Sequence, residues 1–395
     1  MTSRFGICFQ TLILLLIRPY YWTAYRVRCW GRLPWRRPAT LVLCNHQHDF
    51  DTNVTINQMG LAGPWNRPIY SAGSRRMFEP GFMATRLPWL RSRLRTVSAT
   101  KLFTALGIVP IENELRTRSL ASLAWWIYAR HGEVPLTKAF RNDILARLPA
   151  AAAATTVGAL FGEKWFKPAQ EMRVPLKAVL DPYQSEILEQ TREHLEPDFQ
   201  RLEQVLKDGN TLFLTPEGRY STDGHMSPLR TALPRLQQFA QSIYLLAVSY
   251  DVFAGKRLST LFRIVPPADP DDLRTSMQAP RPVTVSQLLA AWLVASEHPS
   301  FTADEARAAV VDRLRALPTN AFVDPQLRAN PQRMVAAALA GMQQLGTLVE
   351  DAGGLRLTSQ RRHPQFPLVA DMLAYQANFF GETVGALECL AGARS

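Results

Sequence analysis

Short apolar runs alternate with longer helical patterns over the first two thirds of the chain. The first run is apolar on both faces and ends at a polar cluster, as strands buried inside a parallel sheet do. Five such runs are found, at residues 39–44, 68–72, 106–111, 210–215 and 243–249. A helical pattern at residues 186–207 precedes the fourth. This alternation predicts an α/β fold with a mainly parallel central sheet flanked by helices.

The last third of the chain has a helical pattern. Its predicted elements are a helix with a capping box at Thr302 and Glu305, a hairpin at 348–357 and a long helix near 368–390. Five prolines between residues 266 and 282 indicate a linker before this part. Residues 283–395 are therefore predicted to form a helical C-terminal domain.

The α/β domain is expected over residues 39–268, with an insert at about 118–182 that fits the strand–helix rhythm poorly. Within the insert, residues 148–161 form an uncharged, alanine-rich run, followed by Lys-Trp-Phe-Lys at 164–167. The run is too short for a transmembrane helix, which favours a helix packed on the surface. The Lys-Trp-Phe-Lys tail leaves a second membrane-touching element as the alternative.

The N-terminal segment, residues 1–38, has the composition of a membrane-associating element. Residues 7–17 are largely apolar, but this run is shorter than the roughly 20 residues that span a bilayer. The first 40 residues hold seven arginines, interleaved with Trp and Tyr, and no acidic residue. Such a stretch suits the headgroup layer at the cytoplasmic face, which predicts a helix lying on or half inserted into the membrane. A helix buried in the protein core is the alternative.

The overall charge also predicts an anionic partner. The net charge is +12, and a nucleic acid, an anionic bilayer or a phosphorylated substrate would each fit. The interleaved aromatic residues favour the bilayer. The four cysteines form no CxxC pair, so we expect reduced thiols and no metal centre.

Two histidines and two carboxylates follow the first predicted strand, within residues 45–51. A carboxylate that orients an imidazole makes a general base. Spacing alone leaves three pairs open: His46 with Asp49, His48 with Asp51, and His46 with Asp51, the last only if the chain bends between them. Zinc binding by His46, His48 and Asp51 is disfavoured because no second ligand cluster has a recognisable spacing.

A second polar cluster, residues 215–221, directly follows the fourth predicted strand. Ligands of α/β proteins bind beyond the carboxyl ends of the strands. At this position Gly218 would allow a tight turn, Arg219 could bind a phosphate with two hydrogen bonds, and Glu217 could hold Arg219 or substrate hydroxyls.

Together these clusters resemble the family of glycerolipid and lysophospholipid acyltransferases. His46 and Asp51 match the family's His-x4-Asp catalytic pair, and Pro216-Glu217-Gly218 matches its third sequence block. Weaker matches are residues 107–111 to the second block, and 243–250 with 264–267 to the fourth. The resemblance implies that His46 and Asp51 are catalytic and that Glu217, Gly218 and Arg219 bind substrate.

The chain departs from this family where the acceptor phosphate would be bound. Glu112 and Asn113 stand where the second block normally continues to an arginine. Substitutes for that arginine are Arg116 or Arg118, or else Arg75 and Arg76. The acceptor is therefore left open between a lysophospholipid, glycerol 3-phosphate and a non-phosphate acceptor.

The reaction implied by the resemblance is acyl transfer from a thioester to a hydroxyl. The donor would be acyl-coenzyme A or acyl carrier protein, the acceptor a phosphate-bearing lipid, and no cofactor is needed. A catalytically inactive membrane scaffold is an alternative. So is a nucleic-acid module built on the C-terminal helices and hairpin, but the excess charge lies in the first hundred residues, so no nucleic-acid partner is expected.

Overall fold

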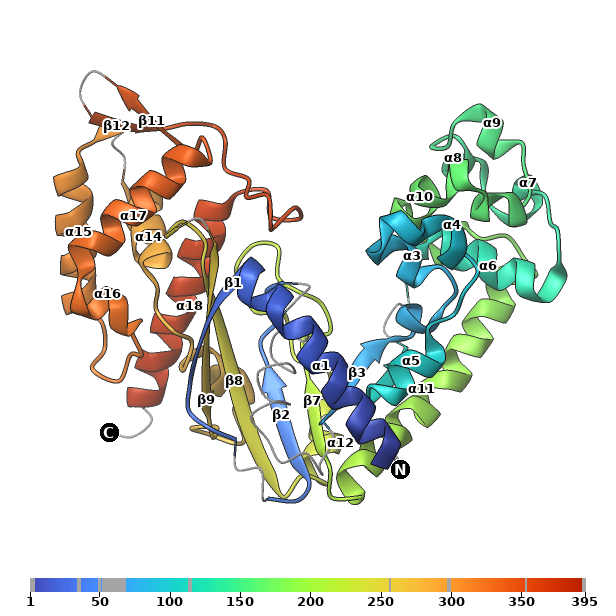
Figure 1. The fold of residues 1–395 in the computed structure, drawn as a ribbon, viewed down its shortest axis with the longest axis horizontal. Coiled ribbons are helices and arrows are strands. Elements are labelled where there is room, and N and C mark those ends of the chain that lie inside the picture. Colours follow the sequence, from blue (N-terminus) through green and yellow to red (C-terminus); the bar gives the residue numbers. More distant parts are fainter. Residues whose placement is uncertain are drawn as a thin grey trace. The chain divides into compact units, whose positions relative to one another are not determined.

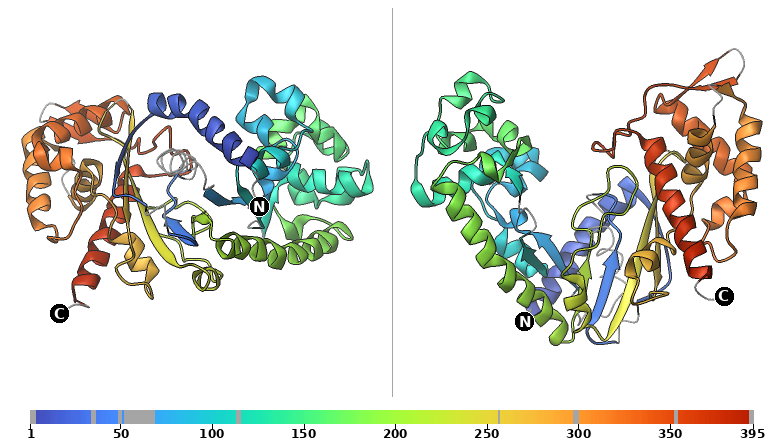
Figure 2. Two further views of the ribbon diagram at one scale, coloured as in Figure 1. Left: turned by 60° about the horizontal axis from the view of Figure 1, so that its bottom comes forward. Right: turned by 180° about the vertical axis from the view of Figure 1, so that it is seen from behind.

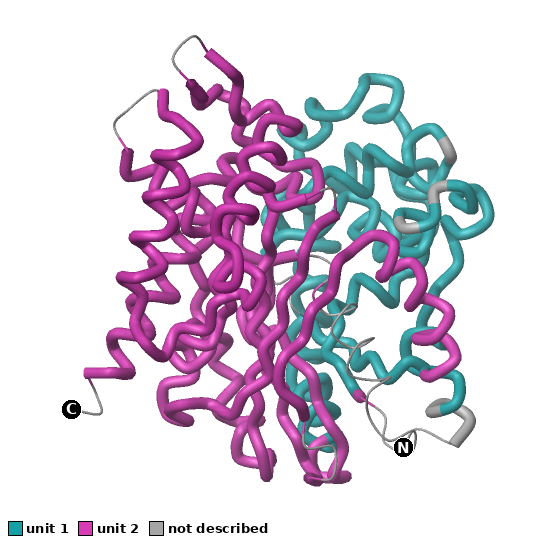
Figure 3. Tube along the Cα trace, turned by 60° about the vertical axis from the view of Figure 1, so that its left-hand side comes forward, with its two compact units in different colours: residues 1–10, 70–205 teal, residues 11–69, 206–395 magenta. Residues whose placement is uncertain are grey.

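Segments far apart in the sequence build each of the two units of this fold. The computed structural model describes residues 4–33, 37–48, 51, 69–112, 116–255, 257–296, 300–351 and 354–392. One unit joins residues 1–10 to 70–205, and the other joins 11–69 to 206–395 (Figure 3). The limits of these two units differ from the three segments expected from the sequence, which were residues 1–38, 39–268 and 283–395.

Five strands of the mainly parallel central sheet lie in the larger unit (Figure 1). They are β1 (Tyr25–Trp30), β9 (Leu258–Val265), β8 (Ser242–Asp251), β2 (Thr40–Cys44) and β7 (Thr211–Leu214), in that spatial order. β2 is parallel to both β7 and β8, β1 is parallel to β9, and only β8 and β9 run antiparallel. Every residue of β2 is buried, as its apolar run predicts. The prediction of an α/β fold with a mainly parallel sheet is confirmed.

Strand β1 lies in the basic and aromatic stretch that was expected to lie on lipid headgroups. Its six residues instead pair with β9, from Tyr25 opposite Leu258 to Trp30 opposite Arg263. The guanidinium of Arg28 donates to both carboxylate oxygens of the buried Asp324, at 2.6 and 2.7 Å. Part of the N-terminal basic charge is thus neutralised inside the protein.

The first helix, α1 (Arg4–Ala24), is longer than the apolar run that predicts it. From residue 11 on it belongs to the larger unit. Six of its large apolar and aromatic side chains are exposed: Leu12, Leu15, Leu16, Ile17, Tyr20 and Trp22. Among the described residues, no helix has both the length and the hydropathy needed to cross a membrane.

The C-terminal helices share one core with the sheet. Helices α14 (Val285–Ala295) and α18 (Met372–Gly392) lie side by side next to the sheet (Figure 2), and Leu288 and Leu373 belong to the same buried cluster as Val248 of β8. The predicted capping box at the start of α15 (Ala303–Ala316) and the predicted hairpin, β11 (Leu348–Asp351) with β12 (Gly354–Leu357), are both present. Gly353 lies outside the described residues. The expected linker contains a short helix, α13 (Leu273–Gln278).

The smaller unit has a core of its own. It contains most of β3 (Ile69–Ser74), which is parallel to β4 (Ile108–Ile111), and the long helix α11 (Tyr183–Lys207). The alanine-rich run does not form the one surface helix expected. It forms α9 (Ala150–Ala153) and a 3-10 turn (Gly158–Phe161), because the large side chains at its end are buried in this core. Lys-Trp-Phe-Lys lies in α10 (Glu163–Glu171), with Phe166 buried.

A buried carboxyl group in the larger unit makes its stability depend on pH. Asp251, at the end of β8, is fully buried, and one of its oxygens accepts hydrogen bonds from Ser286. Burial, to which the nearby Asp324 adds, raises the pKa of Asp251 from 3.8 to about 6, while Arg28 acts in the opposite direction. The folded state therefore binds this proton more tightly than the unfolded chain does. The stability it provides is complete below pH 4 and is lost as the pH rises through 6.

We predict that Asp251→Asn removes this loss. Relative to the Asn variant, the wild-type free energy of unfolding should fall by about 3 kcal/mol between pH 3 and pH 8, since one pKa unit corresponds to ~1.4 kcal/mol. Urea unfolding of both proteins across this pH range measures the difference. Parallel stability curves would show that Asp251 does not change its protonation state on unfolding.

Candidate active site

The turn after β2 is held against β8 by side-chain hydrogen bonds to the backbone of β8. The Asn45 amide donates to the carbonyl of Val248 at 3.0 Å, and its oxygen accepts from the Val248 N–H at 2.7 Å. Gln47 donates to the same carbonyl at 2.6 Å. Both side chains are buried, so the chain leaves the sheet in one defined direction. His46 lies between these two anchored residues.

Asp51 is the buried centre of this turn. Its side chain is completely inaccessible to solvent. One carboxylate oxygen contacts His46 Nδ1 at 3.1 Å and accepts from the backbone N–H groups of Gln47 at 2.5 Å and His48 at 2.8 Å. The other oxygen accepts from the hydroxyl of Tyr250 on β8. Burial, together with this carboxylate, raises the pKa of Tyr250 well above its usual value, so Tyr250 remains a donor.

These contacts select one of the three possible histidine–carboxylate pairs. His46 and Asp51 meet because the chain turns between them, with the Asp51 N–H donating to the His48 carbonyl at 3.0 Å. His48 offers its backbone N–H to Asp51, while its ring Nε2 lies 2.7 Å from the carbonyl oxygen of Gln365. Asp49 lies outside the described residues.

The pairing determines which nitrogen of His46 can act as a base. An ionised carboxylate only accepts hydrogen bonds, so Nδ1 carries the proton that faces Asp51. Nε2 is then the basic nitrogen. The side chain of His46 is 16% exposed, whereas that of Asp51 is fully buried. The pair therefore has the arrangement of a general base oriented by a carboxylate.

Glu217 joins the second polar cluster to the first. Its two carboxylate oxygens accept from the backbone N–H groups of His46 and Ser227, both at 2.9 Å. Burial raises the pKa of Glu217, although these two hydrogen bonds, Arg281 and His46 oppose the rise. Glu217 thus connects the two loops, in place of the expected grip on Arg219. Arg219 is exposed.

Gly218 provides the tight turn expected of it. Its φ of +70° lies in the left-handed region, and a Cβ there would come within 2.5 Å of the Arg230 guanidinium. The next aromatic residue, Tyr220, places its ring edge-on to the ring of His46, with centroids 5.5 Å apart. Sequence reasoning assigned no role to Tyr220 or Tyr250. Tyr220 lies two positions after Gly218, the last residue of the matched block, and this is the only signal that points to it.

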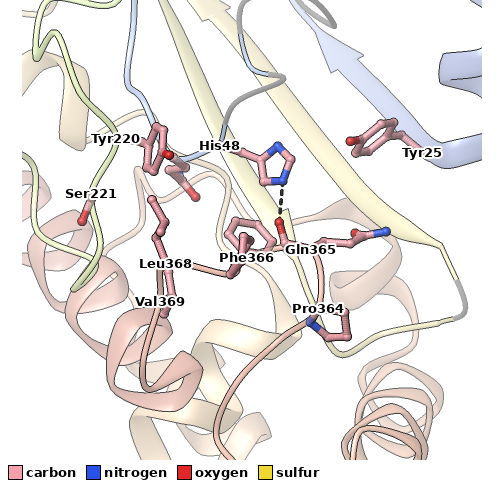
Figure 4. Close-up of a pocket in the computed structure, with 11 residues that line it drawn as sticks. Tyr25, His48, Tyr220, Ser221, Pro364, Gln365, Phe366, Leu368 and Val369 are labelled. Carbon is pink, nitrogen blue, oxygen red and sulfur yellow. Dashed lines mark hydrogen bonds between the residues drawn. The ribbon is translucent and has the colours of Figure 1, made fainter. Parts of the chain in front are cut away.

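A cavity of about 270 Å³ opens beside the turn that carries His46, at Gln47 and His48 (Figure 4). Four segments of the larger unit line it: Tyr25 at the start of β1, Gln47 and His48, Tyr220 and Ser221, and residues 364–369. Sequence reasoning did not place the last segment near the site, because residues 364–369 form no motif and lie more than 300 positions after His46.

The other candidate arginines belong to the smaller unit and are engaged there to different degrees. Arg75, just after β3, forms an ion pair with the buried Asp198, and Arg76 lies 3.4 Å from the side-chain oxygen of Gln170. Arg116 is exposed. Arg118 is buried and donates to Glu112 at 2.7 Å. Of these four, only Arg116 has the exposure expected of a phosphate ligand.

No group of three histidine, cysteine or acidic side chains with metal-binding geometry occurs in the part of the chain that the structure describes. The zinc alternative requires the ring of His48, which is turned toward Gln365. Comparison of the chain with models of known protein families and with characterised proteins found no match.

We predict that Tyr250→Phe destabilises the protein by about 2 kcal/mol, because a buried carboxylate loses one of its hydrogen-bond donors without gaining another. Urea unfolding of the full-length protein measures this change in the free energy of unfolding. The matched control is Tyr20→Phe, because the Tyr20 ring is exposed on α1. We expect this substitution to change the free energy of unfolding by less than ~0.5 kcal/mol. Equal effects of the two substitutions would mean that the Tyr250 hydroxyl does not stabilise Asp51.

Proposed function

We propose that this protein is an acyltransferase that moves a fatty acyl group from a thioester to a hydroxyl of a glycerol-phosphate or lysophospholipid acceptor. The observation that carries the proposal is the His46–Asp51 pair, with the carboxylate buried and the imidazole partly exposed. A base of this kind suits removal of a proton from a substrate hydroxyl.

The contact between the two sequence motifs supports acyl transfer over other uses of a general base. The His-x4-Asp and Pro-Glu-Gly elements are separated by 171 positions between His46 and Glu217, yet the Glu217 carboxylate accepts directly from the His46 N–H. The resemblance to glycerolipid acyltransferases requires these two elements to form one site. A chance match of either motif would not require them to meet.

In the proposed reaction, the acceptor hydroxyl gives its proton to His46 Nε2 while its oxygen bonds to the thioester carbonyl carbon. Asp51 stabilises the imidazolium that forms. The tetrahedral intermediate then collapses, the carbon–sulfur bond breaks, and the departing thiolate takes the proton from His46. The products are an ester and a free thiol, of coenzyme A or of acyl carrier protein, and His46 returns to its neutral form.

We further propose that α1 binds the cytoplasmic membrane surface. Leu16 is 66% exposed, and its neighbours along the helix expose further apolar and aromatic side chains. The guanidinium of Arg18 lies 4.5 Å from the centre of the Trp22 ring, which places a cation beside an interfacial aromatic residue. Apolar burial and attraction to anionic lipids would act together in such a helix.

The activity is tested by the release of free thiol from acyl-coenzyme A or acyl carrier protein, with lysophospholipids, glycerol 3-phosphate and a non-phosphate alcohol as acceptors. We expect acceptor-dependent release that falls by about two to four orders of magnitude in His46→Ala, and by no more than that in Asp51→Asn. Radiolabelled acyl chain must appear in the acceptor, since thiol release alone would also follow from hydrolysis.

The same assay examines Arg219. If it contacts the acceptor phosphate, Arg219→Ala raises the acceptor KM far more than the thioester KM, and leaves a non-phosphate acceptor unaffected. Absence of transfer with both donors and every acceptor would reject the enzyme and favour an inactive scaffold. Full activity in His46→Ala would reject the proposed base.

Membrane binding is tested by sedimentation with vesicles that contain phosphatidylglycerol. We predict that Leu15→Glu with Leu16→Glu lowers the partition coefficient at least about tenfold, since two apolar side chains leave the interface. Val294→Glu changes an equally exposed apolar residue on α14 and should leave binding unchanged. Equal binding of all three proteins would reject α1 as the membrane contact.

A further inference from the structure

The cavity beside Gln47 and His48 has a lining suited to an apolar group. Of the described residues, eleven line it, and none of these is Lys, Arg, Asp or Glu. Phe366, Leu368 and Val369 supply apolar surface, and Leu368 is 57% exposed. A phosphate would find no charged partner among these eleven residues, whereas a hydrocarbon chain would be removed from water by their apolar surface.

The C-terminal wall of the cavity is attached to the catalytic turn. The Gln365 carbonyl oxygen lies 2.7 Å from His48 Nε2. The Phe366 ring packs edge-on against the ring of His48, with centroids 4.9 Å apart, and against Tyr250 at 5.5 Å. Tyr250 is also the donor to Asp51. The wall formed by residues 364–369 is therefore held in a defined position relative to the catalytic pair.

The cavity also begins close to the reacting atoms. Tyr220 lines it, and the ring of Tyr220 lies edge-on to the ring of His46. In Figure 4, Tyr220 and Leu368 lie on one side of His48, whose ring points to the carbonyl of Gln365. A group bonded directly to the carbon that the acceptor attacks would enter the cavity past Tyr220.

We propose that this cavity receives the acyl chain of the thioester donor and that residues 364–369 determine which chain lengths are accepted. The inference rests on the proposed acyl transfer. The methylenes of the donor begin one bond from the reacting carbonyl carbon. The chain of a lysophospholipid is separated from its reacting hydroxyl by a polar glycerol and an ester. The mostly apolar walls of this cavity offer few hydrogen-bond partners to these polar groups.

The size of the cavity makes chain length the property to test. A volume of 270 Å³ lies just below the roughly 300–1,000 Å³ of pockets that hold small-molecule ligands. A short acyl chain fits inside. A longer chain must extend past Leu368, whose exposed side chain stands at the opening. A larger side chain there should obstruct long chains and spare short ones.

The first experiment compares hexanoyl and palmitoyl pantetheine as donors with one fixed acceptor, since pantetheine is common to coenzyme A and acyl carrier protein. Leu368→Trp should lower the ratio of kcat/KM for palmitoyl over hexanoyl about tenfold or more. The larger side chain takes room from a long chain, and one methylene more or less in an apolar pocket changes kcat/KM by about tenfold or more. Activity with hexanoyl pantetheine should stay within about twofold of wild type. Val294→Trp, at an exposed position of α14 that does not line the cavity, should leave the ratio unchanged.

An unchanged ratio in Leu368→Trp would overturn the inference. So would a shift in the preferred chain length of the lysophospholipid at a fixed donor, because the cavity would then hold the chain of the acceptor. Leu368 is exposed, so loss of folding is not expected, and circular dichroism verifies this for each variant.

The second experiment needs no turnover. An S-alkyl pantetheine thioether with a photoreactive diazirine on its chain is irradiated with the full-length protein, and the labelled peptide is identified by mass spectrometry. Label within residues 364–369 that hexadecyl pantetheine competes away supports the inference, and label confined to other segments overturns it. If the wild type transfers no acyl group but this label appears, the proposed reaction fails while chain binding by the cavity stands.

Discussion

The candidate site depends on the solvation of one buried carboxylate. Asp51 is removed from water, and protein groups replace its hydration shell: two backbone N–H groups of its own turn, the ring of His46 and the hydroxyl of Tyr250. An ionised carboxylate without such partners would be too costly to bury. Because the donors come from both the turn and β8, the turn can take its shape only when it is attached to the sheet. The position of His46 follows from that attachment.

The sequence predicts this site in part, and the geometry of the sheet explains the remainder. Residues 45–51 show that a histidine and a carboxylate will be close, but three pairings fit the spacing. Strand register decides among them: Cys44 pairs with Leu246, so β8 continues alongside the turn and brings Tyr250 to Asp51. A hydrophobic pattern shows which face of a strand is buried, but not which residue of a distant strand lies opposite, which is why sequence reasoning assigned Tyr250 no role.

Strand β1 shows how composition can conceal secondary structure. Alternation of arginines with aromatic residues is typical of a membrane interface, and it is equally compatible with an edge strand that has one exposed face. The missing information was the partner of Arg28, a buried aspartate nearly 300 positions later in the chain. The C-terminal helices were predicted correctly as elements. Their shared core with the sheet depends on contacts that local patterns do not encode.

The pairing of β1 with β9 has a consequence for the order in which the chain can fold. Tyr25 lies opposite Leu258, so the first strand of the sheet must wait for a partner that is synthesised more than 200 residues later. Closing so long a loop has an entropic cost that is offset only once the two strands are paired. Proteins with such long-range contacts therefore fold slowly. Residues 70–205 lie between the two sequence segments of the larger unit. The described residues of the hydrophobic core of the smaller unit all belong to 70–205. During translation the smaller unit can therefore consolidate first, while the turn that carries His46 is assembled only after β8 has left the ribosome.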